Sequence, residues 1–124
     1  MKLIGIRYFT RLKKKNRGNT KLVKAIDKLI DDLKRAQWSN KDEVLSDRSD
    51  ADCIHSDGFY FFNINIHRTM ILIEYSLESS NNNSEEDTGV ANILWVGSHD
   101  DYERVFKNNK STINKWLKDQ GLID

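Results

Sequence analysis

The spacing of apolar residues at the start of the chain predicts a short strand followed by a short helix. Residues 2–7 alternate apolar and polar side chains, as one edge of a sheet does. The stretch 9–17 is rich in lysine and arginine and is predicted to be helical up to Gly18, since glycine is common just past the last helical residue.

A longer helix is predicted to begin at Asn19 or Thr20, either of which can cap it, and to run to Trp38. Five apolar residues recur along it at helical spacing, and they predict one face packed on a core: Leu22, Ile26, Leu29, Ile30 and Leu33.

The middle of the chain reads as a series of strands. A helical turn at 42–45 precedes a short strand at 52–55, and Asp57-Gly58 then favours a tight hairpin. Aromatic and β-branched residues predict strands at 59–66, 69–77 and 90–97, with a turn at His67-Arg68 and a polar loop at 78–89.

Two helices are predicted to close the chain. Ser98 with Asp101 three residues later matches a capping box, and Ser111 or Thr112 can cap the last helix. The order β-α-α-β-β-β-β-α-α indicates an α+β fold, in which an antiparallel sheet joined by the first strand carries helices on one face.

Composition narrows the class of protein. A chain of 124 residues suits a single domain, and it contains no apolar run long enough to span a membrane. The one cysteine, Cys53, excludes an internal disulfide and a zinc site built from several thiolates. We therefore expect a protein of the reducing cytoplasm, with no membrane, metal or cofactor involved.

Charge is spread unevenly along the chain. Residues 1–48 hold 14 Lys or Arg against 6 Asp or Glu, whereas residues 49–106 hold 2 against 11. This asymmetry indicates either a surface that faces a polyanion or two parts of the fold that attract each other.

Four short motifs stand in a fixed order along the chain: Ala36-Gln37-Trp38, Ala51-Asp52, Phe62-Asn63-Ile64 and Gly97-Ser98-His99-Asp100-Asp101-Tyr102. In this order and spacing they make the chain similar to the HigB toxins of the RelE superfamily, over about residues 3–106. The resemblance implies a toxin domain at 1–106, with two N-terminal helices packed on a small antiparallel sheet, and a helical extension at 107–124.

The resemblance also implies a function. HigB-type toxins are mRNA interferases of type II toxin–antitoxin systems, which cleave mRNA without a metal or cofactor, usually on the ribosome, and so stop translation and growth. The implied partners are a HigA-like helix-turn-helix antitoxin, mRNA and the 70S ribosome.

Such cleavage is attack of a ribose 2′-OH on the adjacent phosphate, which needs a base, cations and an acid. The resemblance makes His99 and Tyr102 the candidates for proton transfer, and their spacing puts them on one helical face. The alternative is that His99 is an ordinary residue at a helix start and that Tyr102 packs in the core.

Arg68 is either the candidate phosphate clamp or an ordinary turn arginine. The family has an arginine where this chain has Met70, and Arg68 lies two residues earlier, on the same strand face.

The candidate RNA-binding residues are a basic run and one histidine: Lys13, Lys14, Lys15, Arg17 and His67. The run is either an RNA-backbone surface or a merely solvated face. We expect His99 and Tyr102 to face a groove that also contains Arg68 and at least one of Lys13, Lys14 and Arg17.

Three functions remain open on this sequence. The first is a ribonuclease toxin, and the second is a non-catalytic RNA- or ribosome-binding module on the same fold, which Met70 suggests. The third is a small protein-interaction domain whose basic half docks an acidic partner.

Overall fold

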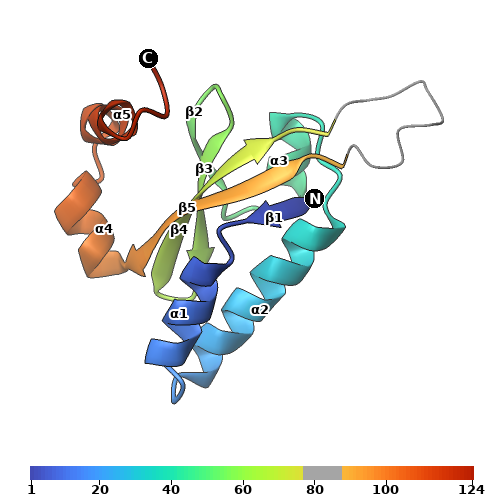
Figure 1. Cartoon of the computed structure of the whole chain (residues 1–124), viewed down its shortest axis with the longest axis vertical. Helices are drawn as coiled ribbons and strands as arrows, with labels where there is room; N and C mark the ends of the chain where they lie inside the picture. Colours follow the sequence, from blue (N-terminus) through green and yellow to red (C-terminus); the bar gives the residue numbers. More distant parts are fainter. Residues whose placement is uncertain (77–87) are drawn as a thin grey trace.

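The computed structural model of the chain describes residues 1–76 and 88–124. Its elements, shown in Figure 1, are β1 (Lys2–Ile4), α1 (Arg7–Lys15), α2 (Thr20–Arg35), α3 (Lys41–Asp47), β2 (Asp52–His55), β3 (Phe59–Ile64), β4 (His67–Glu74), β5 (Val90–Ser98), α4 (His99–Phe106) and α5 (Lys110–Asp119). The predicted order of elements is confirmed except for α3, since the helical turn predicted at 42–45 is a full helix that the predicted order omits. The loop predicted at 78–89 lies outside the described residues except at Thr88 and Gly89.

The five strands form one sheet in the order β1-β5-β4-β3-β2. β2 to β5 pair antiparallel as a meander, which confirms the α+β fold with a mostly antiparallel sheet. β1 joins the sheet as expected but runs parallel to β5. Parallel neighbours need a long connection, and here three helices, α1 to α3, and the other three strands lie between β1 and β5 in the chain.

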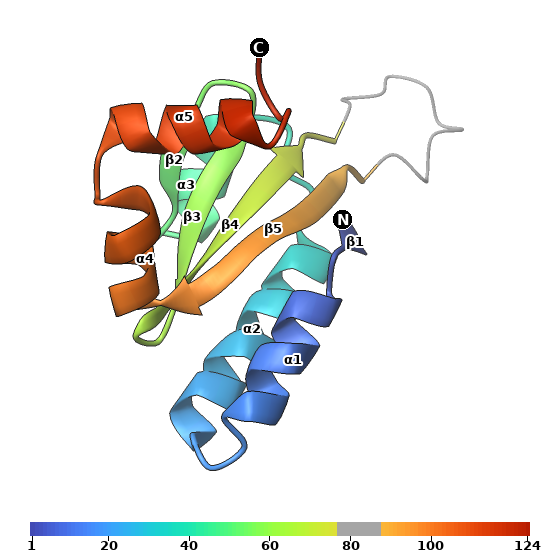
Figure 2. The ribbon, with the colours of Figure 1, turned by 60° about the vertical axis from the view of Figure 1, so that its left-hand side comes forward.

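Helices cover both faces of the sheet, so the prediction that they pack on one face is wrong. Figure 2 shows α1 and α2 on one side and α4 and α5 on the other. The reason lies in β3, where Phe59, Tyr60, Phe61 and Phe62 are all buried, and a strand that is apolar on both faces needs cover on both.

Each face has its own apolar core. The first joins α1, α2 and α3 to the sheet and includes Phe9, Leu22, Ile26, Leu29, Leu33, Val44, Tyr60, Phe62, Ile71 and Ile93. The second joins α4 and α5 to the opposite face and consists of Ile54, Phe59, Phe61, Met70, Tyr102, Phe106, Ile113 and Leu117. The helical stripe predicted for α2 is buried as expected, except that Ile30 is only partly buried.

Several helix boundaries differ from the prediction, and the first helix, α1, begins and ends two residues earlier than the predicted stretch 9–17. α2 ends at Arg35, because Ala36 is extended with ψ 142° and Trp38 turns away to stack on Phe62 at 6.4 Å. Asn109, rather than Ser111 or Thr112, caps α5 by accepting a hydrogen bond from a backbone N–H.

The turn between β3 and β4 falls two residues earlier than predicted. Asn65 and Ile66 form it, and Asn65 has φ 61°, a conformation that asparagine tolerates well. His67 and Arg68 are therefore strand residues, with Arg68 directly opposite Asn63. This register fixes the face of the sheet from which Arg68 projects.

Candidate active site

A pocket of about 560 Å³ opens at the end of the sheet where β3 turns into β4 and β5 leads into α4. Its lining comes from the β3–β4 hairpin, from α4 and from the turn after α4: Asn63, Asn65, Ile66, His67, Arg68, His99, Tyr102, Glu103 and Asn108. Three residues that the sequence singled out as catalytic candidates, Arg68, His99 and Tyr102, thus line one cavity.

The start of α4 is fixed by local hydrogen bonds. Ser98 Oγ accepts from the backbone N–H of Asp101 at 3.1 Å, and Asp101 Oδ2 accepts from the N–H of Ser98 at 3.2 Å, which confirms the predicted capping box. These bonds hold the pKa of the Asp101 carboxyl below its usual value. At Gly97 an added Cβ would lie 2.6 Å from the Trp95 ring and 3.0 Å from Cβ of Asp101 in α4, so glycine lets α4 pack closely after β5.

His99 and Tyr102 share one face of α4, as their spacing predicts. Their rings are stacked with centroids 6.2 Å apart and planes inclined by 22°. The His99 side chain is 65% exposed, and its Nε2 lies 3.5 Å from Glu103 Oε1, whereas Tyr102 is only 3% exposed. The histidine is therefore open to solvent in the pocket, and the tyrosine forms its wall.

Arg68 lies across the aromatic wall of the pocket. Its guanidinium carbon is 4.7 Å from the Tyr102 ring centroid and 5.3 Å from that of Phe61, both at cation–π distance. Its Nε donates a 3.0 Å hydrogen bond to Oδ1 of Asn63 on the neighbouring strand. The arginine is thus held in place from two directions.

Tyr102 is neutral near neutral pH. Burial raises the pKa of its phenol, although the neighbouring Arg68 cation acts in the opposite direction. The phenol O–H donates a 3.0 Å hydrogen bond to Oδ1 of Asn108, in the turn after α4. Its proton is therefore already engaged within the protein.

His67 also lines the pocket but is less open than His99. Burial lowers the pKa of its imidazole, with the Asp101 carboxylate acting the other way. Its Nδ1 is buried and makes no hydrogen bond within the described residues. The lowered pKa keeps the His67 ring beside Arg68 neutral at neutral pH.

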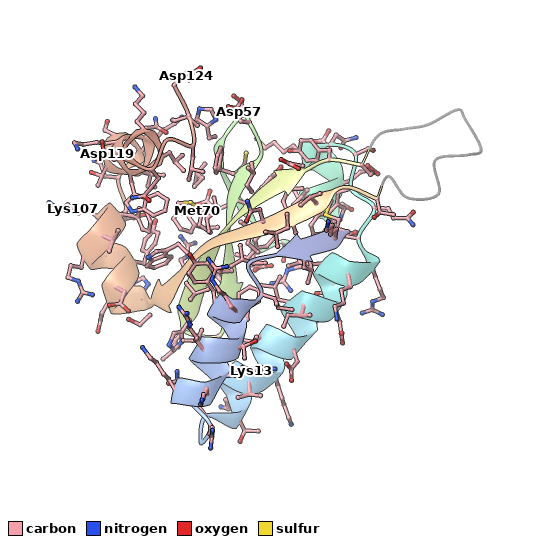
Figure 3. The ribbon with its side chains drawn as sticks, viewed as in Figure 1. Lys13, Asp57, Met70, Lys107, Asp119 and Asp124 are labelled. Atoms are coloured by element: carbon pink, nitrogen blue, oxygen red, sulfur yellow. The ribbon has the colours of Figure 1, made fainter. Side chains whose placement is uncertain are left out.

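The basic run of α1 does not belong to the pocket lining. Lys13, Lys14, Lys15 and Arg17 are all missing from it, which corrects the expectation that at least one of Lys13, Lys14 and Arg17 joins Arg68 in one groove. The reason is that α1 covers the other face of the sheet, where Lys13 pairs with Asp27 of α2 at 2.8 Å (Figure 3).

Met70, the position at which the resemblance implies an arginine, is fully buried. It packs in the second core beneath α4 and α5, as Figure 3 shows, and lies opposite Phe61 on β3. Arg68, two residues earlier, contacts the same Phe61 ring, which confirms that both side chains project from one face. Arg68 lies at the pocket, and Met70 lies in the core behind it.

Four polar residues of the pocket are not among the residues predicted from the sequence: Asn63, Asn65, Glu103 and Asn108. Asn63 enters the sequence analysis only as part of the Phe62-Asn63-Ile64 motif, although the Arg68–Asn63 strand register makes it the partner of the candidate clamp. Asn108 carried a usable signal, because an Asn-Asn pair after a helix is typical of a left-handed turn that brings a side chain back onto the helix.

No group of three or more His, Cys, Asp or Glu side chains that could hold a metal ion occurs within residues 1–76 and 88–124. Among the helices of the same residues, none has the length and apolar composition to cross a bilayer.

A family model described as HigB_toxin, the RelE-like toxic component of a toxin–antitoxin system, matches residues 23–105, which include the β3–β4 hairpin and nearly all of α4. No curated protein gives a significant match to the chain. The matched segment contains Arg68, His99 and Tyr102 and covers about two thirds of the sequence. The chain belongs to the HigB toxin family, and its role is that of the toxin in a toxin–antitoxin pair.

Proposed function

We propose that this toxin is an mRNA interferase, an endoribonuclease that cleaves mRNA on the ribosome in the cytoplasm. One observation carries the proposal: a cationic clamp and a solvent-open imidazole, 31 positions apart in sequence, line a single pocket with a neutral tyrosine. The chemistry of RNA cleavage needs this combination of a proton-transfer group and a fixed positive charge.

In the proposed reaction the ribose 2′-oxygen attacks the adjacent phosphorus. A bond forms between the 2′-oxygen and phosphorus, the bond to the 5′-oxygen breaks, and a cyclic phosphate remains. The 2′-OH proton passes to the base, and the departing 5′-oxygen takes up a proton from the acid. His99, whose imidazole is 65% exposed in the pocket, suits the proton transfer.

Arg68 is proposed to bind the phosphate as negative charge develops on it. Because Nε is already bonded to Asn63, the phosphate would be held by Nη1 and Nη2, which suits the bidentate geometry of a guanidinium. Tyr102 presents its ring and phenol oxygen to the RNA, and the neutral His67 lies beside the clamp as an auxiliary hydrogen-bonding group.

The basic residues of α1 are proposed to bind the RNA backbone outside the pocket. In Figures 1 and 2 the β3–β4 turn lies in the same half of the molecule as α1, whose C-terminal end projects beyond the sheet. Lys14, Lys15 and Arg17 are exposed there, so a strand that leaves the pocket would pass close to their charges.

The family implies an antitoxin, and we propose that it is a HigA-like helix-turn-helix protein. Covering the basic residues with an acidic or shape-matched segment would block RNA and silence the toxin. Co-purification of the toxin with the product of the adjacent gene tests this partner. A neighbouring gene whose product does not bind the toxin would contradict it.

RNA cleavage by the purified toxin, with and without ribosomes, tests the proposed activity. His99→Ala and Arg68→Ala should each lower the cleavage rate by about 10²-fold or more, because each removes one part of the transition-state stabilisation. His55→Ala and Arg35→Ala are the matched controls, since both residues lie outside the pocket lining. Intact RNA in every arm, or equal rates for the pocket and control variants, would contradict the proposal.

A further inference from the structure

The turn between α4 and α5 begins the segment beyond the family match, which ends at residue 105. Lys107 and Asn108 both have positive φ angles, 56° and 47°, in the left-handed region. Asparagine adopts this conformation at less cost than most residues do. The turn therefore has a defined geometry, and it aims the Asn108 side chain back toward the pocket.

The two asparagines of this turn have different tasks. Asn109 caps α5, because its side chain accepts the backbone N–H of Thr112 at 3.1 Å. The Asn108 side chain instead accepts the phenol O–H of Tyr102, at 3.0 Å from Oδ1. Of this pair, only Asn108 lines the cavity that holds Arg68 and His99.

Packing on either side of the turn holds Asn108 in place. On one side Phe106 is fully buried and packs edge-on against Trp116 of α5 at 5.4 Å. On the other side Ile113 and Leu117 of α5 are buried in the core that contains Tyr102. The position of the acceptor oxygen relative to the phenol thus depends on the docking of α5.

A phenol has one proton to donate and two lone pairs that accept. Because Asn108 takes the proton of Tyr102, the phenol oxygen can only accept further hydrogen bonds, from the neighbouring Arg68 guanidinium or from a donor in the pocket. A phenol without this acceptor could turn its O–H toward a phosphate oxygen or water and would lose a defined role. Burial keeps the phenol neutral, so its hydrogen bonding is set by the acceptor it finds.

We infer that Asn108 is a positioning residue that fixes Tyr102 as a hydrogen-bond acceptor facing the RNA, so that residues 107–124 contribute to the active site. The inference rests on the proposed ribonuclease function and extends it to a part of the chain outside the family match. The group that meets the phenol oxygen is an RNA hydrogen-bond donor, a ribose hydroxyl or a base N–H, since phosphate oxygens carry no proton to donate at neutral pH.

Two substitutions at position 108 distinguish the effect of the side-chain acceptor from the effect of the turn conformation. Asn108→Gly keeps the left-handed turn and removes only the side-chain acceptor, whereas Asn108→Asp keeps an acceptor oxygen at the same reach. Lys107→Gly is the matched control, because it loosens the same turn without touching the bond to Tyr102.

We expect Asn108→Gly to lower kcat by about 5- to 10-fold, the equivalent of one hydrogen bond, with KM unchanged. Asn108→Asp should restore kcat to within about twofold, on the same one-bond scale, but raise KM because its carboxylate repels the RNA phosphates. In a Tyr102→Phe background Asn108→Gly should have no further effect, since the phenol proton is already gone.

The Cζ carbon resonance of Tyr102, assigned by its loss in Tyr102→Phe, reports the hydrogen bond without any RNA. It should move in Asn108→Gly and return toward its wild-type position in Asn108→Asp. An unchanged kcat and an unchanged resonance in Asn108→Gly, or an equal loss in Lys107→Gly, would overturn the inference. If the wild-type chain cleaves no RNA, the proposed function fails, and the resonance alone decides whether Asn108 positions Tyr102.

Discussion

Replacing Met70 by arginine should destabilise this protein. Met70 is fully buried among aromatic and aliphatic side chains, opposite Phe61 and beneath Phe106 of α4. The change forfeits about 1.5–3 kcal/mol of apolar burial and places a guanidinium where water and counter-charges are excluded, which costs several kcal/mol more. Even if the arginine stem partly reaches solvent, we expect a loss of at least about 3 kcal/mol.

Urea denaturation followed by circular dichroism measures this loss, and a thermal melt should show the midpoint falling by more than about 10 °C. Met70→Leu is the matched control, because it keeps the volume and polarity of the site and should cost less than about 1.5 kcal/mol. A Met70→Arg protein as stable as the wild type would refute the reasoning. It would mean that position 70 reaches the pocket, where the arginine would also raise RNA cleavage.

Three further predictions concern other parts of the molecule. Arg48, only 13% exposed, pairs with Asp32 at 3.0 Å, so Arg48→Met should lower the free energy of unfolding by about 2–3 kcal/mol in urea titrations, and an unchanged midpoint would contradict this. The pKa of His67 is lowered by burial, so its stabilising effect is complete above the unfolded pKa of about 6.5 and is lost as the pH falls through the lower folded value. Denaturation midpoints should therefore decline from pH 7.5 to pH 5, and less steeply in His67→Gln; equal slopes would contradict the assignment. Lys14→Ala with Lys15→Ala should weaken RNA binding and reduce the slope of log affinity against log salt by about 1.5–2, measured by fluorescence anisotropy, whereas an unchanged slope would place the RNA elsewhere.

Local signals in the sequence predicted the helices well. The apolar stripe of α2 and the Ser98–Asp101 capping box depend only on residues within a few positions of each other, and both are found in the structure. The β3–β4 turn was misplaced by two residues because His67 and Arg68 look like turn residues by type. Burial of the neighbouring strands, which the local sequence does not contain, decides their place in β4.

Non-local features were the hardest to predict. The parallel pairing of β1 with β5 joins segments that are about 90 residues apart, and no local pattern encodes the direction of such a pair. The cover on both faces of the sheet was present in the sequence as four consecutive apolar residues, Phe59 to Phe62, but it was interpreted only as strand propensity. Consecutive apolar residues in a strand indicate two buried faces, and this would have placed α4 and α5 correctly.

The candidate site was predictable where it depends on spacing within one helix or one strand. Helical spacing put His99 and Tyr102 together, and strand geometry put Arg68 and Met70 on one face. The exclusion of the α1 lysines and the inclusion of Asn108 both follow from which helix covers which face. That choice depends on tertiary packing, which the residue types of α1 do not reveal.

The buried Met70 and the helix α5 belong to one packing arrangement. Ile113 and Leu117 of α5 close the second core over the sheet, and with that cover in place the side chain at position 70 meets only apolar neighbours. An arginine at this position would need a path to solvent that α5 blocks, so an apolar residue is the stable choice. Arg68, one strand repeat closer to the β3–β4 turn, lines the pocket, where Asn63 and the Tyr102 ring hold it. Under the proposed function the phosphate clamp therefore lies at the β3–β4 end of the sheet, and Met70 belongs to the core behind it.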